Sequence, residues 1–274
     1  MSNRIGFWVG LSALYVVRGA VCPLKDETTV AYYAGHGATS DCQDWEENFF
    51  TWWAKAEPKV VYHRMTALNT EKDCDLSTYP NLKLWVQPGG DAYDQQTSMK
   101  AGGKENILKF IQRKNSSYLG TCAGYYLAAT DYWWQGEHDA WPNMLGIFPT
   151  LEGSITSIWD YDKPPGYTLT EAASTSGDHN LTTLYWGGPT VGLQHTNKSL
   201  PSDVSVHYTF GSIPGALPAI VSFKNVLLSS VHLEAYEGHP TIDLKPEERL
   251  ANYIMRAKLI NSVTGLSWKI PTST

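Results

Sequence analysis

The amino-acid sequence predicts an α/β protein whose sheet is mostly parallel, with an antiparallel extension in the C-terminal half. Short apolar segments alternate with helical patterns between residues 29 and 130. After residue 140, short strand patterns follow one another, separated by Gly, Pro and Thr, until a final helix. Alternation implies parallel strands joined by crossover helices, whereas consecutive short strands favour antiparallel pairing. Because the parallel strands are apolar on both sides, we expect helices on both faces of the sheet.

The N-terminal elements follow from the spacing of apolar residues and from the residues that end each segment. Residues 29–34 are apolar on both sides and precede a Gly-His-Gly turn. Large apolar groups at helical spacing predict a helix over 45–56, which Pro58 stops. The same criteria predict strands at 59–63, 82–86 and 117–119, and helices at 104–113 and 123–130.

The C-terminal half contains short strand patterns and one long helix. Pro246 opens this helix, which is expected to run to Ser262 with an apolar face of Leu, Tyr, Ile and Ala. No internal repeat or linker is evident, so residues 21–274 are expected to form one domain. The expected strands are 146–148, 153–159, 183–185, 204–210, 219–223 and 226–231, with a turn at 224–225.

Residues 1–20 are expected to be a secretory signal peptide. Arg4 supplies a positive charge, residues 5–17 form a nearly unbroken apolar run, and Gly19 and Ala20 are small. The run is shorter than the roughly 20 residues of a membrane span, so we expect a secreted protein with no stable membrane span after processing. An uncleaved anchor and a buried N-terminal strand are the alternatives.

Composition and three sequons agree with a secreted globular protein. Hydrophobic residues make up 42% of the chain and charged residues 18%, which is typical of a packed core. The net charge is −6 and no long basic run occurs, which argues against a nucleic-acid partner. Asn115, Asn180 and Asn197 each begin an Asn-x-Ser/Thr sequon and are expected on exposed loops if glycosylated.

The four cysteines allow a disulfide but indicate no metal site. Cys42 and Cys74 both follow expected strand ends and are the preferred pair for an oxidising compartment. Cys22–Cys74 and Cys22–Cys42 stay open, because spacing alone does not determine connectivity. No Cys-x-x-Cys spacing occurs, so neither a structural zinc ion nor another metal or cofactor is expected.

Residues 120–124 read Gly-Thr-Cys-Ala-Gly, the pattern of a nucleophile elbow with cysteine at its centre. A short strand precedes this segment and a helical run follows it. The sharp turn requires small neighbours two residues away, and it holds the central side chain above the sheet edge. The helix N-terminus after Cys122 would stabilise a thiolate. A buried structural cysteine in a tight turn is the alternative.

Two further segments supply the rest of a catalytic constellation. His232 and Glu234 end an apolar strand candidate, so the imidazole is a candidate base for Cys122 and the carboxylate a candidate orienting group. At i and i+2 both side chains leave one face of an extended segment. Gly90 ends another strand, where its backbone could complete an oxyanion hole with the N–H of Ala123.

The order of these motifs resembles class I glutamine amidotransferases. Residues 86–91 (Val-Gln-Pro-Gly-Gly-Asp) and 118–128 more closely resemble the fungal biotin–protein ligase N-terminal-like domain, and 145–148 and 185–189 are similar to further segments of it. The resemblance covers roughly residues 29–262.

This resemblance implies a flavodoxin-like α/β core. It also implies Cys122 as the nucleophile of a triad that His232 and Glu234 complete. Biotin ligation is not implied, because no ligase domain accompanies the segment. The family's His-Pro-Glu pattern has Leu233 at the proline position here.

These features predict a hydrolase of amide or γ-glutamyl-type bonds, with a small-molecule or peptide amide as substrate. A non-catalytic binding or scaffold protein is the alternative, motivated by Leu233 and by the lack of a recognisable glutamine-binding loop. A carbohydrate-active protein is a third interpretation, suggested by Trp133, Trp134 and Trp141, with Glu137 and Asp139 near by but no well-placed carboxylate pair.

Residues that flank the motifs are candidates for the walls of the cleft. Asp91 and Tyr125 are the preferred substrate-binding residues, because they adjoin the Pro-Gly-Gly segment and the elbow. Tyr93 and His195 are further candidates.

Overall fold

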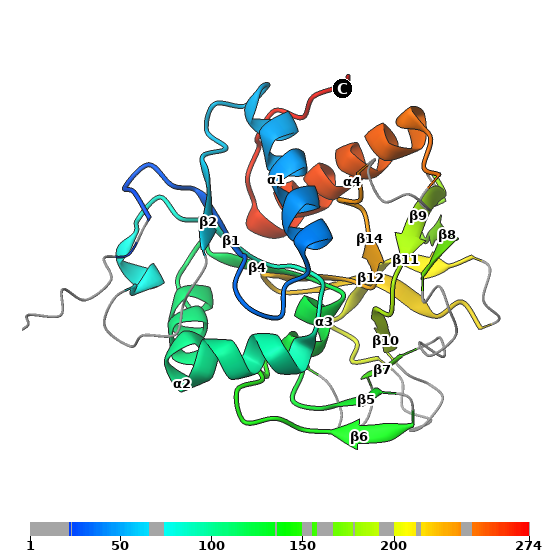
Figure 1. Ribbon diagram of the computed structural model, residues 1–274. Coiled ribbons are helices and arrows are strands. Elements are labelled where there is room, and N and C mark those ends of the chain that lie inside the picture. Colours follow the sequence, from blue (N-terminus) through cyan, green and yellow to red (C-terminus); the bar gives the residue numbers. More distant parts are fainter. Residues whose placement is uncertain are drawn as a thin grey trace, which may run out of the picture.

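A ten-stranded sheet with helices on both faces forms the centre of the molecule (Figure 1). Its strand order is β14-β9-β8-β11-β12-β13-β4-β3-β1-β2. The computed structural model describes residues 22, 24–65, 74–134, 136–149, 155–157, 167–177, 179–191, 200–211, 215–236 and 243–273.

The predicted parallel strands form one half of this sheet. They lie in the order β2-β1-β3-β4-β13, and each pairing between them is parallel. Their carboxyl ends therefore meet at one edge of the sheet, which is where such folds place their ligands. The strands are β1 (Val30–Tyr33), β2 (Tyr62–Met65), β3 (Leu84–Gln87), β4 (Ser117–Thr121) and β13 (Val226–Ser229).

The antiparallel extension continues the sheet from β13. It contains β12 (Pro218–Phe223), β11 (Ser205–Phe210), β8 (Thr168–Ser174), β9 (Leu181–Tyr185) and β14 (Val231–His232). All pairings from β13 to β14 are antiparallel. A separate sheet has the order β10-β7-β5-β6 and contains β10 (Pro189–Val191), β7 (Ile155–Ser157), β5 (Tyr132–Trp134) and β6 (Glu137–Asp139).

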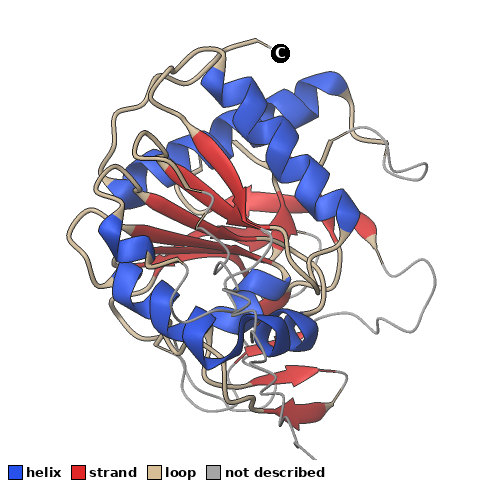
Figure 2. Cartoon of the chain, turned by 60° about the vertical axis from the view of Figure 1, so that its left-hand side comes forward, coloured by secondary structure: helices blue, strands red, loops and turns tan. Residues whose placement is uncertain are grey.

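Four helices cover the two faces of the large sheet (Figure 2). They are α1 (Ser40–Ala54) and α4 (Pro246–Thr264) on one face, and α2 (Ala92–Ile111) and α3 (Ala123–Ala128) on the other. Each face of the sheet carries its own hydrophobic core, and alternate residues of β1 contribute to one or the other. Val30 and Tyr32 lie in the core on the α1 side, and Ala31 and Tyr33 in the core on the α2 side. The predicted α/β fold with helices on both faces is confirmed.

Two helices begin earlier than their apolar spacing indicates. The Thr39 side chain accepts a hydrogen bond from the N–H of Cys42 and so starts α1 at Ser40. Asp91 caps α2 in the same way through the N–H of Asp94. The helix expected at 104–113 is only the C-terminal part of α2, because Lys100 adopts φ 55° and interrupts the helical path.

Several strand predictions differ from the structure. Residues 146–148 form no strand, because their N–H groups donate to the carbonyls of Ala128 and Ala129 at the C-terminal end of α3. Of the segment 153–159, β7 is described and the remainder lies outside the described residues. Strands β5, β6, β8 and β10 and the short 3-10 helix Leu76–Thr78 were not predicted.

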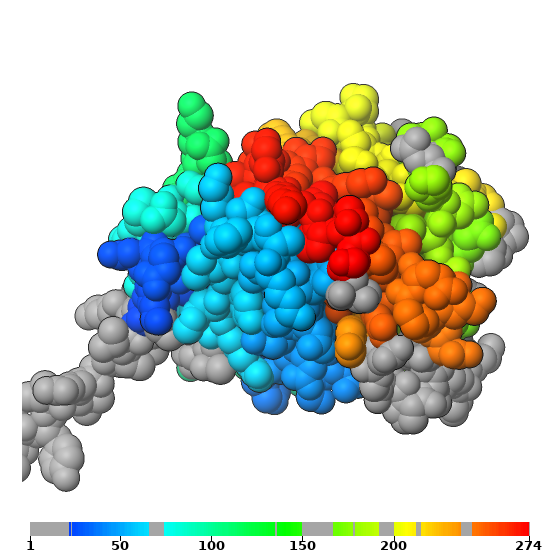
Figure 3. All heavy atoms as spheres, turned by 90° about the horizontal axis from the view of Figure 1, so that it is seen from above, coloured from blue at the N-terminus to red at the C-terminus, as the bar shows by residue number. Residues whose placement is uncertain are grey.

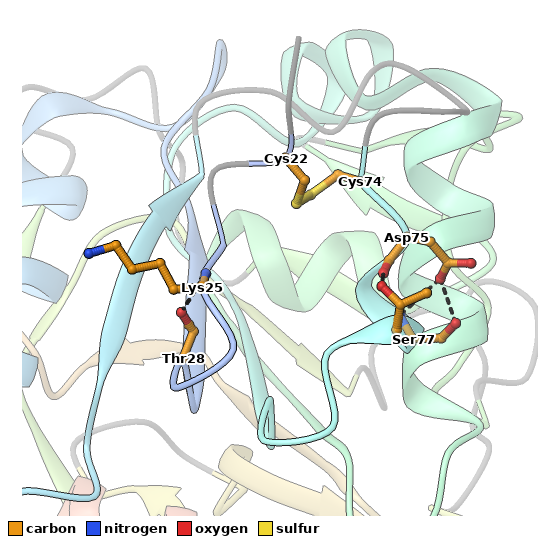
Figure 4. Close-up of a disulfide and its surroundings, with 7 residues drawn as sticks. Cys22, Lys25, Thr28, Cys74, Asp75 and Ser77 are labelled. Atoms are coloured by element: carbon orange, nitrogen blue, oxygen red, sulfur yellow. Dashed lines mark hydrogen bonds between the residues drawn. A yellow bond between two sulfur atoms is a disulfide. The ribbon is translucent and has the colours of Figure 1, made fainter. Parts of the chain in front are cut away.

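The disulfide joins Cys22 to Cys74, so the preferred Cys42–Cys74 pairing is wrong (Figure 4). The Cα atoms of Cys22 and Cys74 lie 4.7 Å apart, within the range for a disulfide. Cys42 lies in the first turn of α1, buried and with a free thiol. The segments around the bridge are held by short-range hydrogen bonds, from Lys25 to Thr28 and from Ser77 to Asp75.

The C-terminal segment packs along α1, as the red and light-blue surfaces in Figure 3 show. The indole of Trp52 donates to the carbonyl of Ser273, and that of Trp53 to the carbonyl of Lys269, each at 2.9 Å. These contacts hold α1 from outside while the sheet holds it from inside. The position of α1 matters because it carries Cys42 toward the elbow.

Several predictions concern parts of the chain that are only partly described. The expected signal peptide 1–20, Asn197 and His195 lie outside the described residues. Asn115 and Asn180 are exposed, as expected of sequon asparagines. None of the helices in the described ranges is long and apolar enough to cross a membrane.

Candidate active site

Cys122 is the first residue after β4 and the residue that precedes α3. Its backbone has φ 51° and ψ −106°, outside the regions that non-glycine residues favour. Such a conformation costs on the order of 1–3 kcal/mol and persists where the surrounding structure enforces it. The N–H of Cys122 donates to the carbonyl of Ser229 in β13 at 2.9 Å, which ties the turn to the neighbouring strand.

Both glycines of the elbow are required by close backbone approach. A Cβ atom on Gly124 would lie 2.0 Å from the carbonyl oxygen of Gln87, and one on Gly120 would lie 2.5 Å from the carbonyl oxygen of Gly124. Neither backbone oxygen can move without shifting a strand or the helix. The predicted requirement for small residues on both sides of Cys122 is therefore confirmed.

His232 and Glu234 lie together in the interior, at the end of the short strand β14. Nδ1 of His232 lies 2.9 Å from Oε1 of Glu234, and both side chains are buried. A turn follows β14, with the N–H of Ala235 bonded to the carbonyl of His232, and this bend lets the two side chains meet. Leu233, which lies between them in the sequence, packs into the core, so this bend forms with leucine at that position.

Cys42, Cys122 and the imidazole of His232 meet around Gly89. A Cβ atom placed there would lie 2.7 Å from Cε1 of His232, 2.8 Å from Sγ of Cys42 and 3.4 Å from Cβ of Cys122. Residues from α1, the elbow and the end of β14 therefore surround one backbone position after β3. Figure 1 shows that α1 and α3 approach this edge from opposite faces of the sheet.

The sulfur of Cys122 lies 3.1 Å from the carbonyl oxygen of Trp186, which accepts a hydrogen bond from the thiol. Nε2 of His232 has no hydrogen-bond partner among the described residues, although the ring interacts with both Cys42 and Cys122. Burial alone lowers the pKa of His232, but Cys42, Glu234 and Cys122 together raise it well above its ordinary value. The site therefore favours an imidazolium beside the thiols.

Cys42, a cysteine of the preferred disulfide pairing, is instead a second free thiol in the site. Burial raises the pKa of its thiol, and the neighbouring His232 opposes that rise. His232 and Cys122 lie far from Cys42 in the sequence, so no local pattern predicts that Cys42 belongs to the site. Aromatic rings enclose the histidine beside it, with Trp45 at 5.5 Å and Trp186 at 6.3 Å between ring centroids.

Glu234 also belongs to a buried network of ion pairs with Arg256 and Glu46. The guanidinium of Arg256 in α4 donates to both carboxylate oxygens of Glu46 in α1, at 2.6 and 2.9 Å, and Nη1 lies 3.7 Å from Oε2 of Glu234. Burial raises the pKa of Glu46 to about 7, and Arg256 opposes the rise. For Glu234 burial acts in the same direction, but Arg256 and His232 outweigh it and lower the pKa.

A buried glutamine holds the Pro-Gly-Gly segment. The side-chain nitrogen of Gln95 lies 3.2 Å from the carbonyl oxygen of Pro88 and 3.3 Å from that of Gly89. Its side-chain oxygen accepts from Gln87, whose own oxygen accepts from the indole of Trp85. The chain of buried amides fixes the loop carbonyls on the side of α2.

The site opens into a pocket of about 360 Å³ that both thiols and His232 line. Gly90 and Asp91 line it, as does Tyr93, whereas Ala123 adjoins it as the first residue of α3. The full lining is Thr39, Cys42, Gly90, Asp91, Ala92, Tyr93, Cys122, Tyr126, Tyr132, Trp134, Asp139, Trp141, Trp186, Gly187 and His232.

Tyr125 does not line this pocket, so its expected contact with substrate is wrong. It is fully buried, and its ring packs against Phe148 at 5.8 Å. Successive residues of a helix differ in direction by about 100°, so Tyr126 takes the place beside the elbow. Its hydroxyl donates to the carbonyl of Gly187 at 3.0 Å.

No group of three metal-ligating side chains is arranged to hold an ion within the described part of the chain. The fold and the site define an α/β protein that places a cysteine on a strand-to-helix elbow beside a buried histidine–glutamate pair. No family model and no curated protein matches the sequence significantly.

Solved structures identify the fold more closely. A glutamine amidotransferase is 15% identical with a TM-score of 0.56, and the match covers 87% of this chain and all of that one. The glutaminase domain of Trypanosoma brucei CTPS with bound acivicin is 11% identical with a TM-score of 0.53, and the match covers 90% of this chain and 97% of that domain. The fold is therefore that of glutamine amidotransferases. The finer resemblance to a biotin–protein ligase domain stays a prediction.

Proposed function

We propose that this protein is a cysteine hydrolase of amide bonds, with Cys122 as nucleophile, His232 as acid and base, and Glu234 as the orienting carboxylate. The observation that carries the proposal is that the elbow cysteine, through its Cβ, and the buried His232–Glu234 pair both lie beside Gly89. A thiolate beside an imidazolium is the form in which cysteine attacks carbonyl groups. The glutamine amidotransferase-like fold supports the same reaction class.

In the proposed reaction the proton of Cys122 moves to Nε2 of His232, and the sulfur attacks the carbonyl carbon. The C–N bond breaks as His232 gives this proton to the leaving amine, and a thioester remains on Cys122. Water then attacks the thioester while His232 takes its proton, which releases the acid and restores the thiol. The N–H groups of Gly90 and Ala123 are the proposed donors to the oxyanion, each worth about 10²–10³ in rate.

The amide substrate and the secreted location are parts of the same proposal. The glutaminase domain among the structural neighbours supports a substrate with an amide nitrogen as leaving group. The Cys22–Cys74 disulfide supports an oxidising compartment, because such bonds persist outside the cytosol. The exposed Asn115 and Asn180 agree with this location.

A non-catalytic binding protein is the second candidate, and one observation favours it. The thiol of Cys122 donates to the carbonyl of Trp186, while Nε2 of His232 makes no hydrogen bond within the described residues. In this arrangement the thiol proton is directed to a backbone carbonyl oxygen and not to the imidazole. Catalytic hydrogen bonds commonly tighten only in the substrate complex.

Alkylation by iodoacetamide near pH 7, followed by peptide mapping, separates the two candidates. For the hydrolase we expect Cys122 to react at least about tenfold faster than an ordinary thiol, because the imidazolium stabilises its thiolate. His232→Ala should abolish that advantage. Cys122→Ala should remove the fast label, whereas Cys42→Ala should retain labelling at Cys122.

Two results would contradict the hydrolase. Fast labelling at Cys42 instead of Cys122 would move the nucleophile to α1. Labelling of both thiols at the ordinary rate, unchanged by His232→Ala, would establish the non-catalytic candidate. Retained circular dichroism of each variant serves as the folding control.

A further inference from the structure

One wall of the pocket is a series of aromatic rings that hold one another in place. The rings of Tyr93 and Trp141 lie 4.6 Å apart, and the indole of Trp141 donates to the hydroxyl of Tyr132 at 3.1 Å. Tyr126 continues the series, with ring centroids 4.8 Å from Tyr132 and 5.8 Å from Trp134. All five side chains line the pocket. The wall is therefore ordered before any ligand enters.

Apart from His232, the charged residues that line the pocket are both acidic. Asp91 and Asp139 both line the pocket, and no lysine or arginine of the described ranges does so. Asp139 is partly buried in β6, opposite Tyr132 of the aromatic wall, and burial raises its pKa. Asp91 lies at the N-terminus of α2, next to Tyr93 of the wall.

Rings and carboxylates around one cavity attract a cation. An ammonium group gains from the π systems of aromatic rings and from the negative charge of the two acids. Free glutamine also carries an α-carboxylate, which would meet Asp91 and Asp139 with no lysine or arginine among the described lining residues to pair with it. The wall therefore favours a cationic group without a neighbouring carboxylate.

His232 indicates where the reacting bond would lie. Its Nε2 is fully buried, belongs to a residue that lines the pocket, and has no hydrogen-bond partner among the described residues. A ligand that occupies the pocket can supply that partner. The amide would then lie at His232 and Cys122, and the remainder of the molecule would extend along the aromatic wall toward Asp139.

We propose that the pocket takes amides that carry an ammonium group, held between the aromatic wall and the carboxylates of Asp91 and Asp139. This inference rests on the proposed function for the position of the reacting bond. The cation site itself rests on the rings and carboxylates alone, so binding can test it without turnover.

The test compares choline with 3,3-dimethyl-1-butanol, which has the same shape and no charge, by tryptophan fluorescence titration of the full chain. We expect choline to bind at least about tenfold more tightly, because only the charged ligand gains from rings and carboxylates. Asp139→Asn and Asp91→Asn should each weaken choline binding severalfold and leave the neutral ligand unchanged. Asparagine also caps helices, so Asp91→Asn keeps the start of α2.

Glu137→Gln is the matched control. Glu137 lies in β6 with Asp139 but is exposed and does not line the pocket, so its loss should leave choline binding unchanged. Equal affinity for the charged and neutral ligands, or tighter binding of L-glutamine than of choline, would overturn the inference. If an aspartate variant fails to fold, the ligand pair measured on the unmodified chain still decides.

The choline titration and the labelling of Cys122, both measured on the unmodified chain, distinguish this inference from the proposed function. A preference for choline together with ordinary reactivity of Cys122 would overturn the hydrolase and leave the cation site standing. Fast labelling of Cys122 together with equal affinity for choline and the neutral ligand would overturn the cation site and leave the hydrolase standing.

Discussion

Nδ1 of His232 lies 2.9 Å from Oε1 of Glu234, and both side chains are excluded from solvent. The carboxylate fixes the direction of the ring, so that Nε2 is the atom left to exchange a proton with the thiols. Because no water reaches the pair, the interaction is far stronger than it would be at the surface.

Glu234→Gln removes the charge and keeps the shape of the side chain. We expect the rate of Cys122 alkylation at pH 7 to fall to that of an ordinary thiol, and any amide turnover to fall by about 10²–10⁴. The reason is that the neutral amide no longer stabilises the imidazolium of His232. The alkylation rate of Cys122 measured across a range of pH tests this role. An unchanged profile would contradict the role assigned to Glu234.

Gly89→Ala should disrupt the site while leaving most of the fold intact. The added methyl group would lie 2.7 Å from Cε1 of His232 and 2.8 Å from Sγ of Cys42, so at least one of these side chains must move. We expect the alkylation rate of Cys122 to fall at least about tenfold, because a misplaced base loses its proton-transfer geometry. Gly136→Ala is the control for backbone strain outside the pocket lining, because its Cβ would meet nothing within 4 Å although its φ of 87° disfavours alanine. Equal rates for both variants would count against the convergence at Gly89.

Arg256→Met should destabilise the protein by about 3–5 kcal/mol, measured as the free energy of unfolding in urea at pH 7. Loss of the guanidinium leaves the buried carboxylates of Glu46 and Glu234 without compensation. The double variant with Glu46→Gln should recover part of the loss, because one uncompensated charge is removed. Additive effects of the two substitutions would contradict the coupling.

Glu46 gives the unfolding free energy a defined pH dependence. Its pKa in the folded protein is about 7, against about 4.5 when unfolded, so the unfolded state releases its proton first. The stabilisation from this group is full below about pH 4.5 and is lost as the pH rises to about 7, by up to about 3 kcal/mol. Glu46→Gln should remove this loss. Parallel pH curves for the variant and the unmodified protein would refute the assignment.

The cysteine assignment has its own chemical test. Alkylation under denaturing, non-reducing conditions should label Cys42 and Cys122 only, and peptide mapping should recover Cys22 linked to Cys74. Removal of the bridge by Cys22→Ser with Cys74→Ser should lower the unfolding free energy by about 2–4 kcal/mol, because the unfolded chain regains entropy. A peptide linked through Cys42 would contradict the structure.

The sequence predicted the elements whose signals are local. The apolar segments of β1, β3 and β4, the helix after Pro246 and the glycine-flanked elbow depend on neighbours in the chain, and each lies within a few residues of its expected place. The first half of α2 was missed, because Lys100 breaks its periodicity. Strands β5 and β6 were missed because three-residue strands are stabilised by cross-strand pairing, which no local pattern displays.

The sequence by itself determined which residues have the chemistry of a cysteine site: a thiol on a strand-to-helix turn, and a histidine two residues before a glutamate. Only the tertiary structure decided what surrounds them. It brought Cys42 to the site instead of to a disulfide, buried Tyr125 while turning Tyr126 to the pocket, and joined Glu46 to Arg256 across 210 residues. Turn geometry depends on adjacent residues, whereas burial and ion pairing depend on which distant segments pack together, and spacing along the chain does not record that.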